Sequence, residues 1–572
     1  MKQQHQEERR RRYERLVKME KPHDKNSDDD ENPPSNIRTS SSSSSAPPVK
    51  IPSHAWKVLA ILSCIATMVM YAETMLIPAI PDLIADFHVS YSMSSWILTA
   101  YLVAGAVMTP IAGKLSDIYG KKKILLFIMI IYAAGVSTAG FATNIYFMLF
   151  ARAVQGIGMA MFPIAFSIVR DEFPREKMSI GTGVIASMFA SGGVLGLVVG
   201  GTIIQYYGWQ ITFFTIIPIA LLLIIIIWRF IHVNEGQQYH NYEQQEQEQQ
   251  RQLQNYRIEN NELTKPRANN NYNNSINYAT RNGIEIKGAI TLAVTLTSFL
   301  IALTYIETTS DGDSGGSSTS SSSSSIQIVG FITAGVISLI IFVIIERRTK
   351  DPLVDFSVLF NRALLPANLI LFVFGLSMFT VFQTIPILAR NPPPLGFGED
   401  AIGYISIQIP FQLILLVFGP TSGFIISKLG SLKPIIAGTI ITTAGFLSLL
   451  LLHSTEFYVS ASLAILSTGL SLSNVGATNV ILLSTPRQFT GISLGMSMIM
   501  RILGSSIGPA FAAAYMQMNQ SPININGVMR SFPSALSFDM IFLTCAIIAF
   551  TSIALAIALR RIVTKMSIPN LS

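Results

Sequence analysis

Long apolar runs alternate with short polar gaps over most of this chain. Apolar runs of about 20 residues recur from about Trp56 to about Leu559, and each is long enough to cross a hydrocarbon core of about 30 Å as a helix. The pattern predicts an all-α polytopic membrane protein with fourteen spans. The predicted spans cover residues 57–80, 94–112, 124–143, 145–169, 180–203, 210–231, 286–306, 326–345, 364–388, 401–425, 435–452, 457–483, 489–517 and 536–559.

The composition agrees with this pattern. The 572 residues are 50% hydrophobic and only 13% charged, whereas a soluble protein has about 25% charged residues. Two polar, low-complexity segments fall outside the apolar pattern and are predicted to be disordered. The predicted domains are a disordered cytoplasmic tail (1–55), an N-terminal six-helix bundle (56–232), a low-complexity cytoplasmic linker (233–285), two additional transmembrane helices (286–346), a C-terminal six-helix bundle (347–563) and a cytoplasmic C-terminal tail (564–572).

Basic residues are distributed unevenly between the two sets of alternating loops. Only Arg390 and Arg530 lie in one set, and seventeen basic residues lie in the other. These are Lys114, Lys121, Lys122, Lys123, Arg170, Arg175, Lys177, Arg347, Arg348, Lys350, Arg362, Lys428, Lys433, Arg487, Arg560, Arg561 and Lys565. Because loops rich in Lys and Arg stay in the cytoplasm, both termini are expected to be cytoplasmic, in a multi-pass protein of the plasma membrane. This placement also explains the net charge of +7 without nucleic-acid binding.

A short cytoplasmic stretch occurs twice. "PIAGKLSDIYGKKK" begins at Pro110 and "PTSGFIISKLGSLK" begins at Pro420, with Pro, two Gly and a Lys at identical spacing. Each stretch joins one apolar run to the next on the same side, so an internal repeat of two parallel halves is predicted, as in many transporters. Ser427 replaces Asp117 in the second copy.

Three charged residues lie well inside predicted spans, away from the span ends: Glu73, Arg152 and Arg501. Charges within a membrane are costly and normally face the bundle interior with a partner. Glu73 is expected about 10 Å short of the outer end of its span. Because burial disfavours an ionised carboxyl, it could exchange a proton at physiological pH; alternatively, it could reach a water-filled vestibule without any function. Arg152 could instead neutralise helix ends.

Small and polar residues mark further candidate positions. Gly192, Gly196 and Gly200 recur at four-residue steps, with Gly201 following, and would permit close helix packing. Polar side chains in apolar spans are candidates for the wall of a substrate cavity, or alternatively only link helices by hydrogen bonds. These candidates are Gln155, Gln383, Gln408, Gln412, Asn479 and Arg501.

Several classes of protein are disfavoured. No GxxxxGK[ST] loop is present, which argues against an ATP-driven pump. The seven histidines do not have metal-ligand spacing, so no metal, no cofactor and no enzymatic activity are expected. Cys64 and Cys545 lie in apolar runs and are expected to be small buried hydrophobic residues.

Over about residues 57–560, the chain resembles the major facilitator superfamily, and within it the fourteen-span drug:proton antiporter branch. The basic loop at 112–123, "RAVQGIG" from Arg152, the glycines from Gly192 and "ERRTKDPLVDFSVLFNR" at 346–362 contribute to the resemblance. The resemblance implies the major facilitator fold: two pseudo-symmetric six-helix bundles plus two extra central helices. Leu197 stands where the antiporter motif has Pro.

The resemblance also implies roles. Glu73 and Arg152 would belong to the proton-coupling machinery, and the glycines would form the antiporter motif. Gly113, Asp117, Gly120, Lys121 and Lys122 would form a conformational latch between the halves; alternatively, the loop is merely basic.

The function implied by the resemblance is proton-coupled export of amphipathic or cationic organic compounds by alternating access, in a protein that acts as a monomer. Its expected partners are a small organic substrate, protons and the lipid bilayer. One alternative is a proton symporter or facilitator for a nutrient or metabolite, which Leu197 favours. Another is a non-transporting membrane sensor or scaffold, which would have no use for buried charges.

Overall fold

The protein is described here from a computed structural model. The structure describes residues 51–173, 178–231, 286–308, 319–349, 356–359, 361–362, 364–485, 490–525 and 527–565. The predicted N-terminal tail up to residue 50, the central linker 232–285 and the C-terminal residues from 566 lie outside this part. The first helix already begins at Ser53, slightly before the predicted domain boundary.

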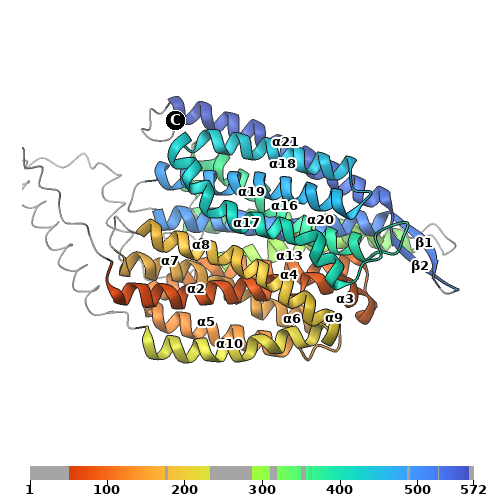
Figure 1. Ribbon diagram of the computed structural model, residues 1–572, viewed down its shortest axis with the longest axis horizontal. Coiled ribbons are helices and arrows are strands. Elements are labelled where there is room, and N and C mark those ends of the chain that lie inside the picture. The colour runs from red at the N-terminus through yellow and green to blue at the C-terminus, as the bar shows by residue number, and fades with distance from the viewer. Residues whose placement is uncertain are drawn as a thin grey trace, which may run out of the picture. The chain divides into compact units, whose positions relative to one another are not determined.

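Helices dominate the described part (Figure 1). The N half contains α2 (Ser53–Thr74), α3 (Ile80–Phe87), α4 (Tyr91–Tyr119), α5 (Lys121–Ala139), α6 (Ile145–Gly156), α7 (Met161–Glu172), α8 (Met178–Leu195), α9 (Gly201–Tyr207) and α10 (Trp209–Phe230). The next helices are α13 (Ile286–Thr308), α14 (Thr319–Arg348) and the short α15 (Phe356–Leu359). The C half contains α16 (Leu364–Arg390), α17 (Ala401–Leu429), α18 (Leu432–Leu451), α19 (Glu456–Ser484), α20 (Thr490–Met518) and α21 (Ala535–Lys565), with the strands β1 (Gln520–Ile525) and β2 (Val528–Pro533).

The described residues include twelve helical segments that are long and apolar enough to cross a membrane. The other two predicted spans also coincide with helices. Residues 180–203 fall on α8, a π-helical turn at Gly196–Gly200 and α9, and residues 286–306 fall on α13, whose apolar part is shorter. The all-helical membrane architecture is therefore confirmed, whereas the count of fourteen spans stays a prediction.

The two ends of the bundle differ in charge. We call the end with Lys121, Lys433 and Arg560 the basic end, and the end with Arg390 and the β1–β2 hairpin the opposite end. Several helices that begin at the opposite end have a side-chain cap, such as Asn144 for α6 and Asp400 for α17, whose oxygens accept backbone N–H groups at 2.9 and 2.8 Å. Such caps satisfy amide groups that a helix start leaves without partners.

Both copies of the repeated stretch have the same local structure. In each copy, a long helix ends at a glycine with positive φ and the next helix begins one or two residues after it. These glycines are Gly120, with φ +96° between α4 and α5, and Gly430, with φ +75° between α17 and α18. Because only glycine adopts such angles without strain, the repeat in the sequence corresponds to a repeat in the structure.

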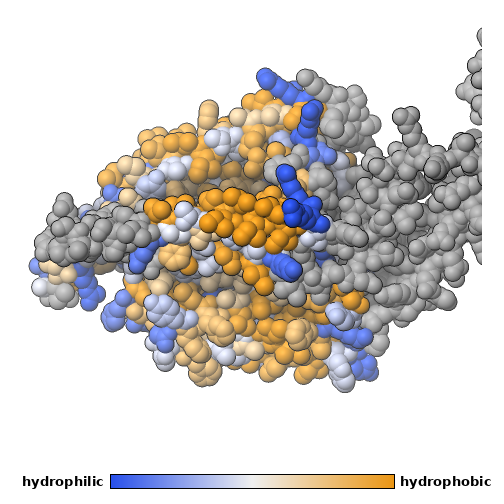
Figure 2. Space-filling model, turned by 180° about the vertical axis from the view of Figure 1, so that it is seen from behind, coloured by the Kyte–Doolittle hydropathy of each residue, from blue (hydrophilic) through white to orange (hydrophobic). Residues whose placement is uncertain are grey.

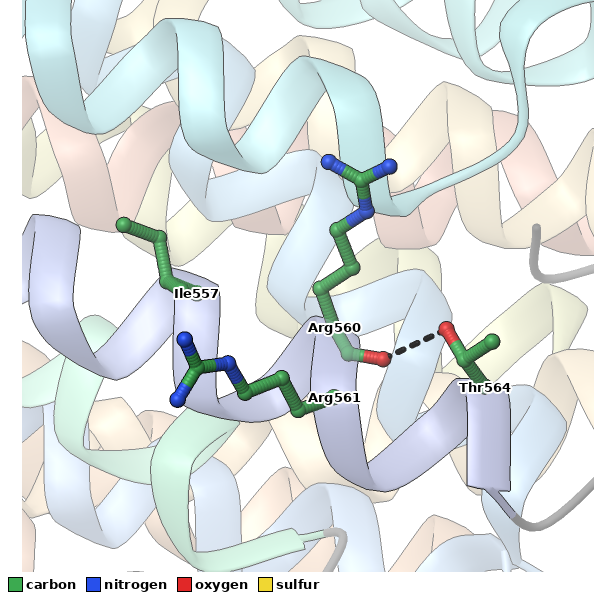
Figure 3. A pocket seen from close by; sticks show the side chains of 4 residues that line it. All are labelled: Ile557, Arg560, Arg561 and Thr564. Atoms are coloured by element: carbon green, nitrogen blue, oxygen red, sulfur yellow. Dashed lines mark hydrogen bonds between the residues drawn. The ribbon is translucent and has the colours of Figure 1, made fainter.

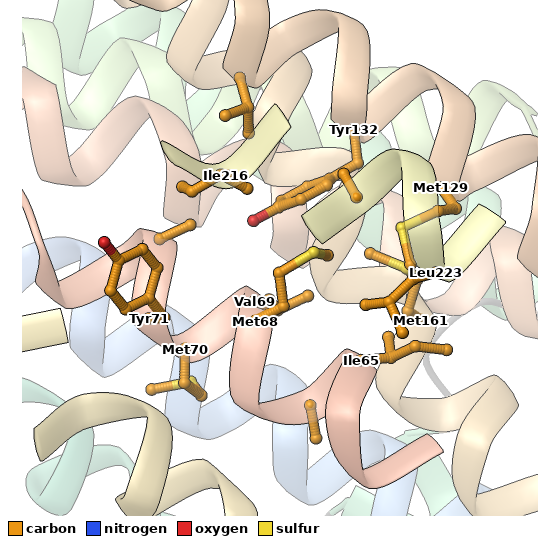
Figure 4. Packing of buried hydrophobic residues seen from close by; sticks show 14 of the residues in the cluster. Ile65, Met68, Val69, Met70, Tyr71, Met129, Tyr132, Met161, Ile216 and Leu223 are labelled. Carbon is orange, nitrogen blue, oxygen red and sulfur yellow. The ribbon is translucent and has the colours of Figure 1, made fainter. Parts of the chain in front are cut away.

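The core consists of apolar clusters within the halves and of clusters shared by both, the largest of which we call the shared cluster. In the N half, side chains of α2, α5, α7 and α10 interdigitate around Met68, Met129 and Met161 (Figure 4). The shared cluster brings Tyr101 and Leu197 of the N half together with Phe382 of the C half. Helices α13 and α14 pack on each other, and α13 also packs on α4 and α20. Helix α13 therefore lies along the seam between the halves, and α14 packs on α13.

Two features differ from the sequence prediction. Residues 520–533 form an antiparallel β-hairpin in which Ile525 pairs with Val528. Cys64 is exposed on α2, whereas Cys545 is buried. The prediction of a buried Cys64 was wrong because apolar residues of a membrane protein can face lipid as well as the core. Figure 2 shows this apolar surface over the middle of the described helices, with polar residues nearer the ends.

Candidate functional site

Glu73 lies deep in the membrane-spanning part of the N half. Its helix continues beyond Thr74 through a short turn and α3, so that the apolar span extends from Ser53 to Phe87. Glu73 is therefore about 20 Å from Phe87 along a helix, not the predicted 10 Å from the end. Its side chain is only 3% exposed. A carboxyl in this position does not reach the end of the bundle by extending its side chain.

Arg152 is completely buried at the end of α6. Its Nε donates to the Ile97 carbonyl at 3.0 Å, and one terminal nitrogen donates to Gln155 Oε1 at 2.8 Å. The guanidinium lies over the ring of Tyr101, 4.9 Å from its centroid. These contacts hold the cation between α4 and α6, consistent with a buried charge that must be paired by polar and aromatic groups.

Tyr101 connects the two predicted proton-coupling residues. Its hydroxyl donates to Glu73 Oε2 at 3.5 Å while its ring stacks on Arg152. Arg501, on α20 of the C half, interacts electrostatically with Glu73 and lies 5.9 Å from the Phe374 ring. The structure therefore brings together a carboxyl, a phenol and two guanidinium groups, drawn from both halves. The sequence analysis missed Tyr101, because a tyrosine in an apolar span carries no distinctive signal.

Some buried polar atoms around this cluster have no hydrogen-bond partner within the described residues. They include Nη2 of Arg152, Nε2 of Gln155 and the hydroxyl of Tyr132. Since most buried polar groups in proteins are paired, these atoms can bond water or a bound molecule. The cluster has the groups needed to move a proton: a carboxyl that can gain or lose it and a phenol that can donate to the carboxylate.

The predicted cavity residues do not all lie together. Gln383 Nε2 donates to Ser94 Oγ across the two halves at 3.1 Å, and both amide atoms of the buried Gln408 lack partners among the described residues. Asn479 instead donates to Ser431 Oγ at 2.7 Å, where α18 begins near the basic end. It therefore links two helices of the C half, in line with the alternative of a helix–helix hydrogen bond.

Gln412 is the C-half candidate nearest to the glycine-rich helix. A Cβ atom placed on Gly193 would lie 3.2 Å from Gln412 Oε1, and one on Gly201 would lie 2.6 Å from Ile405. On another face of the helix, a Cβ on Gly192 would lie 2.4 Å from the Thr67 carbonyl of α2. The glycines therefore let α8 and α9 pack closely between α2 and α17, one helix from each half.

The glycine-rich helix is irregular although it lacks the expected proline. Gly196–Gly200 form a π-helical turn, and Leu197 within it is 1% exposed in the shared core. A wider turn of this kind interrupts a helix without proline and often occurs at functional sites. The replacement of Pro by Leu197 has therefore not left a regular α-helix.

The predicted latch residues make their described contacts within the N half. Lys121 forms a close ion pair with Asp171 at the end of α7, and Lys122 Nζ donates to the Trp228 carbonyl of α10 at 2.9 Å. A Cβ on Gly113 would meet no atom within 4 Å, and the side chain of Asp117 lies outside the described part. The role of these residues as a latch stays a prediction.

An ion pair that the sequence analysis did not predict joins the halves near the opposite end. The two terminal nitrogens of Arg390 donate to the carboxylate oxygens of Asp82 at 2.5 and 2.7 Å, and one also donates to the Pro78 carbonyl at 3.1 Å. At the same end, the backbone N–H of Tyr91 donates to Gln517 Oε1 at 3.1 Å. The only signal in the sequence was that Arg390 is one of just two basic residues in its set of loops.

The comparison with protein families decides the identity of the fold. Residues 62–509 match the family model described as Major Facilitator Superfamily. The chain belongs to this superfamily. It is therefore a multi-span membrane transporter for small molecules and not an enzyme. Among the described residues, no group of three His, Cys, Asp or Glu side chains could hold a metal ion.

Characterised relatives are distant in sequence but similar over most of their length. The chain is 24% identical to the multidrug transporter protein MdtP of Bacillus subtilis (strain 168), over 77% of this chain and 71% of the relative. It is 22% identical to the tetracenomycin C resistance and export protein of Streptomyces glaucescens, over 81% and 76%. It is also 22% identical to the lincomycin resistance protein of Streptomyces lincolnensis, over 87% and 91%.

Solved structures support the same fold. The peptide-transporter-family protein PepTSo matches with a TM-score of 0.56 at 15% identity, covering 91% of this chain and 99% of that one. The human organic anion transporter MFSD10 matches with a TM-score of 0.55 at 14% identity, covering 88% and 100%. At these identities, the likeness concerns the fold alone.

Proposed function

We propose that the protein is a proton-coupled antiporter that exports amphipathic or cationic organic compounds from the cell by alternating access. The observation that supports proton coupling is the deeply buried carboxyl of Glu73, which accepts from the Tyr101 hydroxyl and interacts electrostatically with Arg501 and Arg152. A buried carboxyl of this kind can exist with or without its proton, and binding of a cationic compound nearby favours the ionised form. The names of the relatives, which export or confer resistance to drugs, support the class of substrate.

In this proposal, Glu73 is the titrating group, and Arg152 and Tyr101 set its surroundings. The described hydrogen bonds between the halves, such as Arg390 to Asp82 and Tyr91 to Gln517, lie toward the opposite end. We assign the structure to the state that is closed at this end. With the basic loops in the cytoplasm, this is the inward-facing state of a plasma-membrane protein with cytoplasmic termini, acting as a monomer.

Proton flux in proteoliposomes tests the proposal. Purified protein is reconstituted, a pH gradient is imposed and lipophilic cations are added. We expect the cations to collapse the gradient with the wild type but not with Glu73→Gln, which keeps the size of the side chain and removes its titration. Glu172→Gln is the matched control, because Glu172 is also a carboxyl of the N half but lies at the end of α7.

The outcomes separate the alternatives. If Glu73→Gln still exchanges protons for cations, antiport is retained but Glu73 is not the coupling residue. If the wild type moves a solute and protons in the same direction, the protein is a symporter. If it moves a solute without protons, it is a facilitator. If neither solute nor proton moves with any compound of a broad panel, while circular dichroism shows folded protein, the transporter proposal itself is contradicted.

A further inference from the structure

Helix α21 has two different sides. The buried side packs into the C half through Ala556, Leu559 and Val563. The other side presents large apolar side chains, with Phe550 65% and Ile557 42% exposed. Residues seven apart lie on nearly the same side of a helix that has 3.6 residues per turn. This side is therefore a continuous apolar stripe that faces away from the protein.

The apolar stripe ends in two arginines at the basic end. Arg561 lies eighteen residues after Leu543, which is five helical turns and therefore the same side of α21. Ile557, Arg560, Arg561 and Thr564 line a hollow of about 480 Å³ (Figure 3). The guanidinium groups project in different directions, that of Arg561 lying beside Ile557.

The hollow has positive charge that no described carboxylate neutralises. Both arginines are exposed, and no Asp or Glu of the described part lies within 4.0 Å of either guanidinium. The Thr564 hydroxyl donates to the Arg560 carbonyl at 2.7 Å. Guanidinium groups bind phosphate oxygens in pairs of parallel hydrogen bonds. The exposed guanidinium groups are therefore suited to a phosphate group, and the adjoining stripe is suited to a hydrocarbon chain.

We propose that this surface of α21 binds an anionic phospholipid of the leaflet at the basic end. The phosphate binds the Arg561 guanidinium at the end of the stripe, Arg560 adds positive charge next to it, and an acyl chain runs along the stripe past Ile557 toward Phe550. From the basic end toward the middle of α21, the surface is first positively charged and then apolar. A phospholipid has its phosphate and its acyl chain in the same order. The proposal does not depend on the transported compound, on proton coupling or on which side of the membrane the basic end faces.

The test measures lipid binding to the purified full-length protein by native mass spectrometry. The protein is titrated with phosphatidylglycerol and, separately, with phosphatidylcholine. We expect phosphatidylglycerol to bind more tightly, and Arg560→Gln/Arg561→Gln to weaken it by about tenfold, since each basic residue near an anionic headgroup contributes appreciably. Arg560→Lys/Arg561→Lys should give an intermediate loss, because the charge remains but the paired hydrogen bonds do not.

The matched control is Arg347→Gln/Arg348→Gln. This pair is also adjacent, exposed and at the end of an apolar helix, α14, so the same charge is removed elsewhere at the basic end. The proposal is overturned if the α21 variant binds phosphatidylglycerol like the wild type, or if the control loses as much affinity. It is also overturned if soluble glycerol phosphate competes fully with the lipid, because the site would then bind a free anion. Unchanged melting temperatures show that the variants are folded.

Discussion

The ion pair between Asp82 and Arg390 should hold the halves together at the opposite end. Asp82 lies on α3 in the N half, and Arg390 is the last residue of α16 in the C half. Both terminal nitrogens of Arg390 donate to the Asp82 carboxylate. The Asp82 side chain is 32% exposed and the Arg390 side chain is 19% exposed. Because the two helices belong to different halves, a state that opens at this end must break the pair.

The size of the effect follows from charge, distance and partial burial. Two unit charges about 4 Å apart attract by ~4 kcal/mol at an effective dielectric constant of about 20. Desolvation opposes this attraction, and hydrogen bonds to charged groups contribute a net ~1.5–3 kcal/mol. A loss of about 2 kcal/mol corresponds to a roughly 30-fold change in the ratio of closed to open states. Arg390→Gln should therefore greatly increase the population that is open at this end.

Distances between spin labels measure this population. Labels at the exposed positions His88 and Phe457 report the separation of the halves at the opposite end, in a variant whose two cysteines, Cys64 and Cys545, are replaced. We expect Arg390→Gln to shift the distance distribution toward longer values, and the exchanged pair Asp82→Arg/Arg390→Asp to restore part of the shorter population.

The control is Asp86→Asn, one helical turn further along α3. Asp86 accepts a hydrogen bond of 2.8 Å from Trp209 Nε1 within the same half, so its loss should not separate the halves. An unchanged distribution in Arg390→Gln would refute the reasoning. So would an equal shift in Asp86→Asn, because the effect would then reflect damage to α3.

Two further predictions concern stability. Gly196→Ala should lower the melting temperature by several degrees, since its Cβ would lie 2.0 Å from Thr74 Oγ1 and overpacking costs about 1–3 kcal/mol. Gly113→Ala, with open space around it, should be neutral or stabilising in the same thermal scan. Burial, and then the neighbouring Glu456 carboxylate, raise the pKa of Glu399. A carboxyl whose pKa is higher in the folded state stabilises the protein at low pH, and this contribution is lost as pH rises. Glu399→Gln should therefore melt above the wild type at neutral pH but not below about pH 4; an equal difference at both pH values would contradict this.

The sequence predicted the helical architecture because the thickness of the membrane sets the length of each apolar run that crosses it as a helix. All fourteen predicted ranges coincide with helices, and the repeat reappears as the glycine turns at Gly120 and Gly430. The β-hairpin was not predicted, although Asn-Gly, the dipeptide at positions 526 and 527, is a typical sequence signal for a two-residue hairpin turn. Its strands are short and lie between two long apolar runs.

The candidate site was only partly accessible from the sequence. Charge inside an apolar run identified Glu73 and Arg152, because a buried charge is rare and costly. Sequence could not identify Tyr101, which acts through its position against both residues. Nor could it pair Asp82 with Arg390, which are brought together only by the docking of two halves. Contacts between distant segments depend on tertiary packing, and no local pattern encodes them.

The π-helical turn shows how packing can replace a sequence signal. Thr74 Oγ1 lies 2.9 Å from the Met70 carbonyl and 3.2 Å from the Gly193 carbonyl, and it can donate its one proton to either. The Gly193 carbonyl is the one that the N–H of residue 197 would meet in a regular α-helix. When Thr74 donates to Gly193, a proline at 197 leaves this carbonyl paired. Leu197→Pro should lower the free energy of unfolding little more than Leu197→Ala does. Within α8, by contrast, Met188→Pro should lower it by about 3 kcal/mol more than Met188→Ala. Thermal unfolding of the four variants decides the matter. Equal proline penalties at both positions would mean that the turn does not substitute for the missing proline.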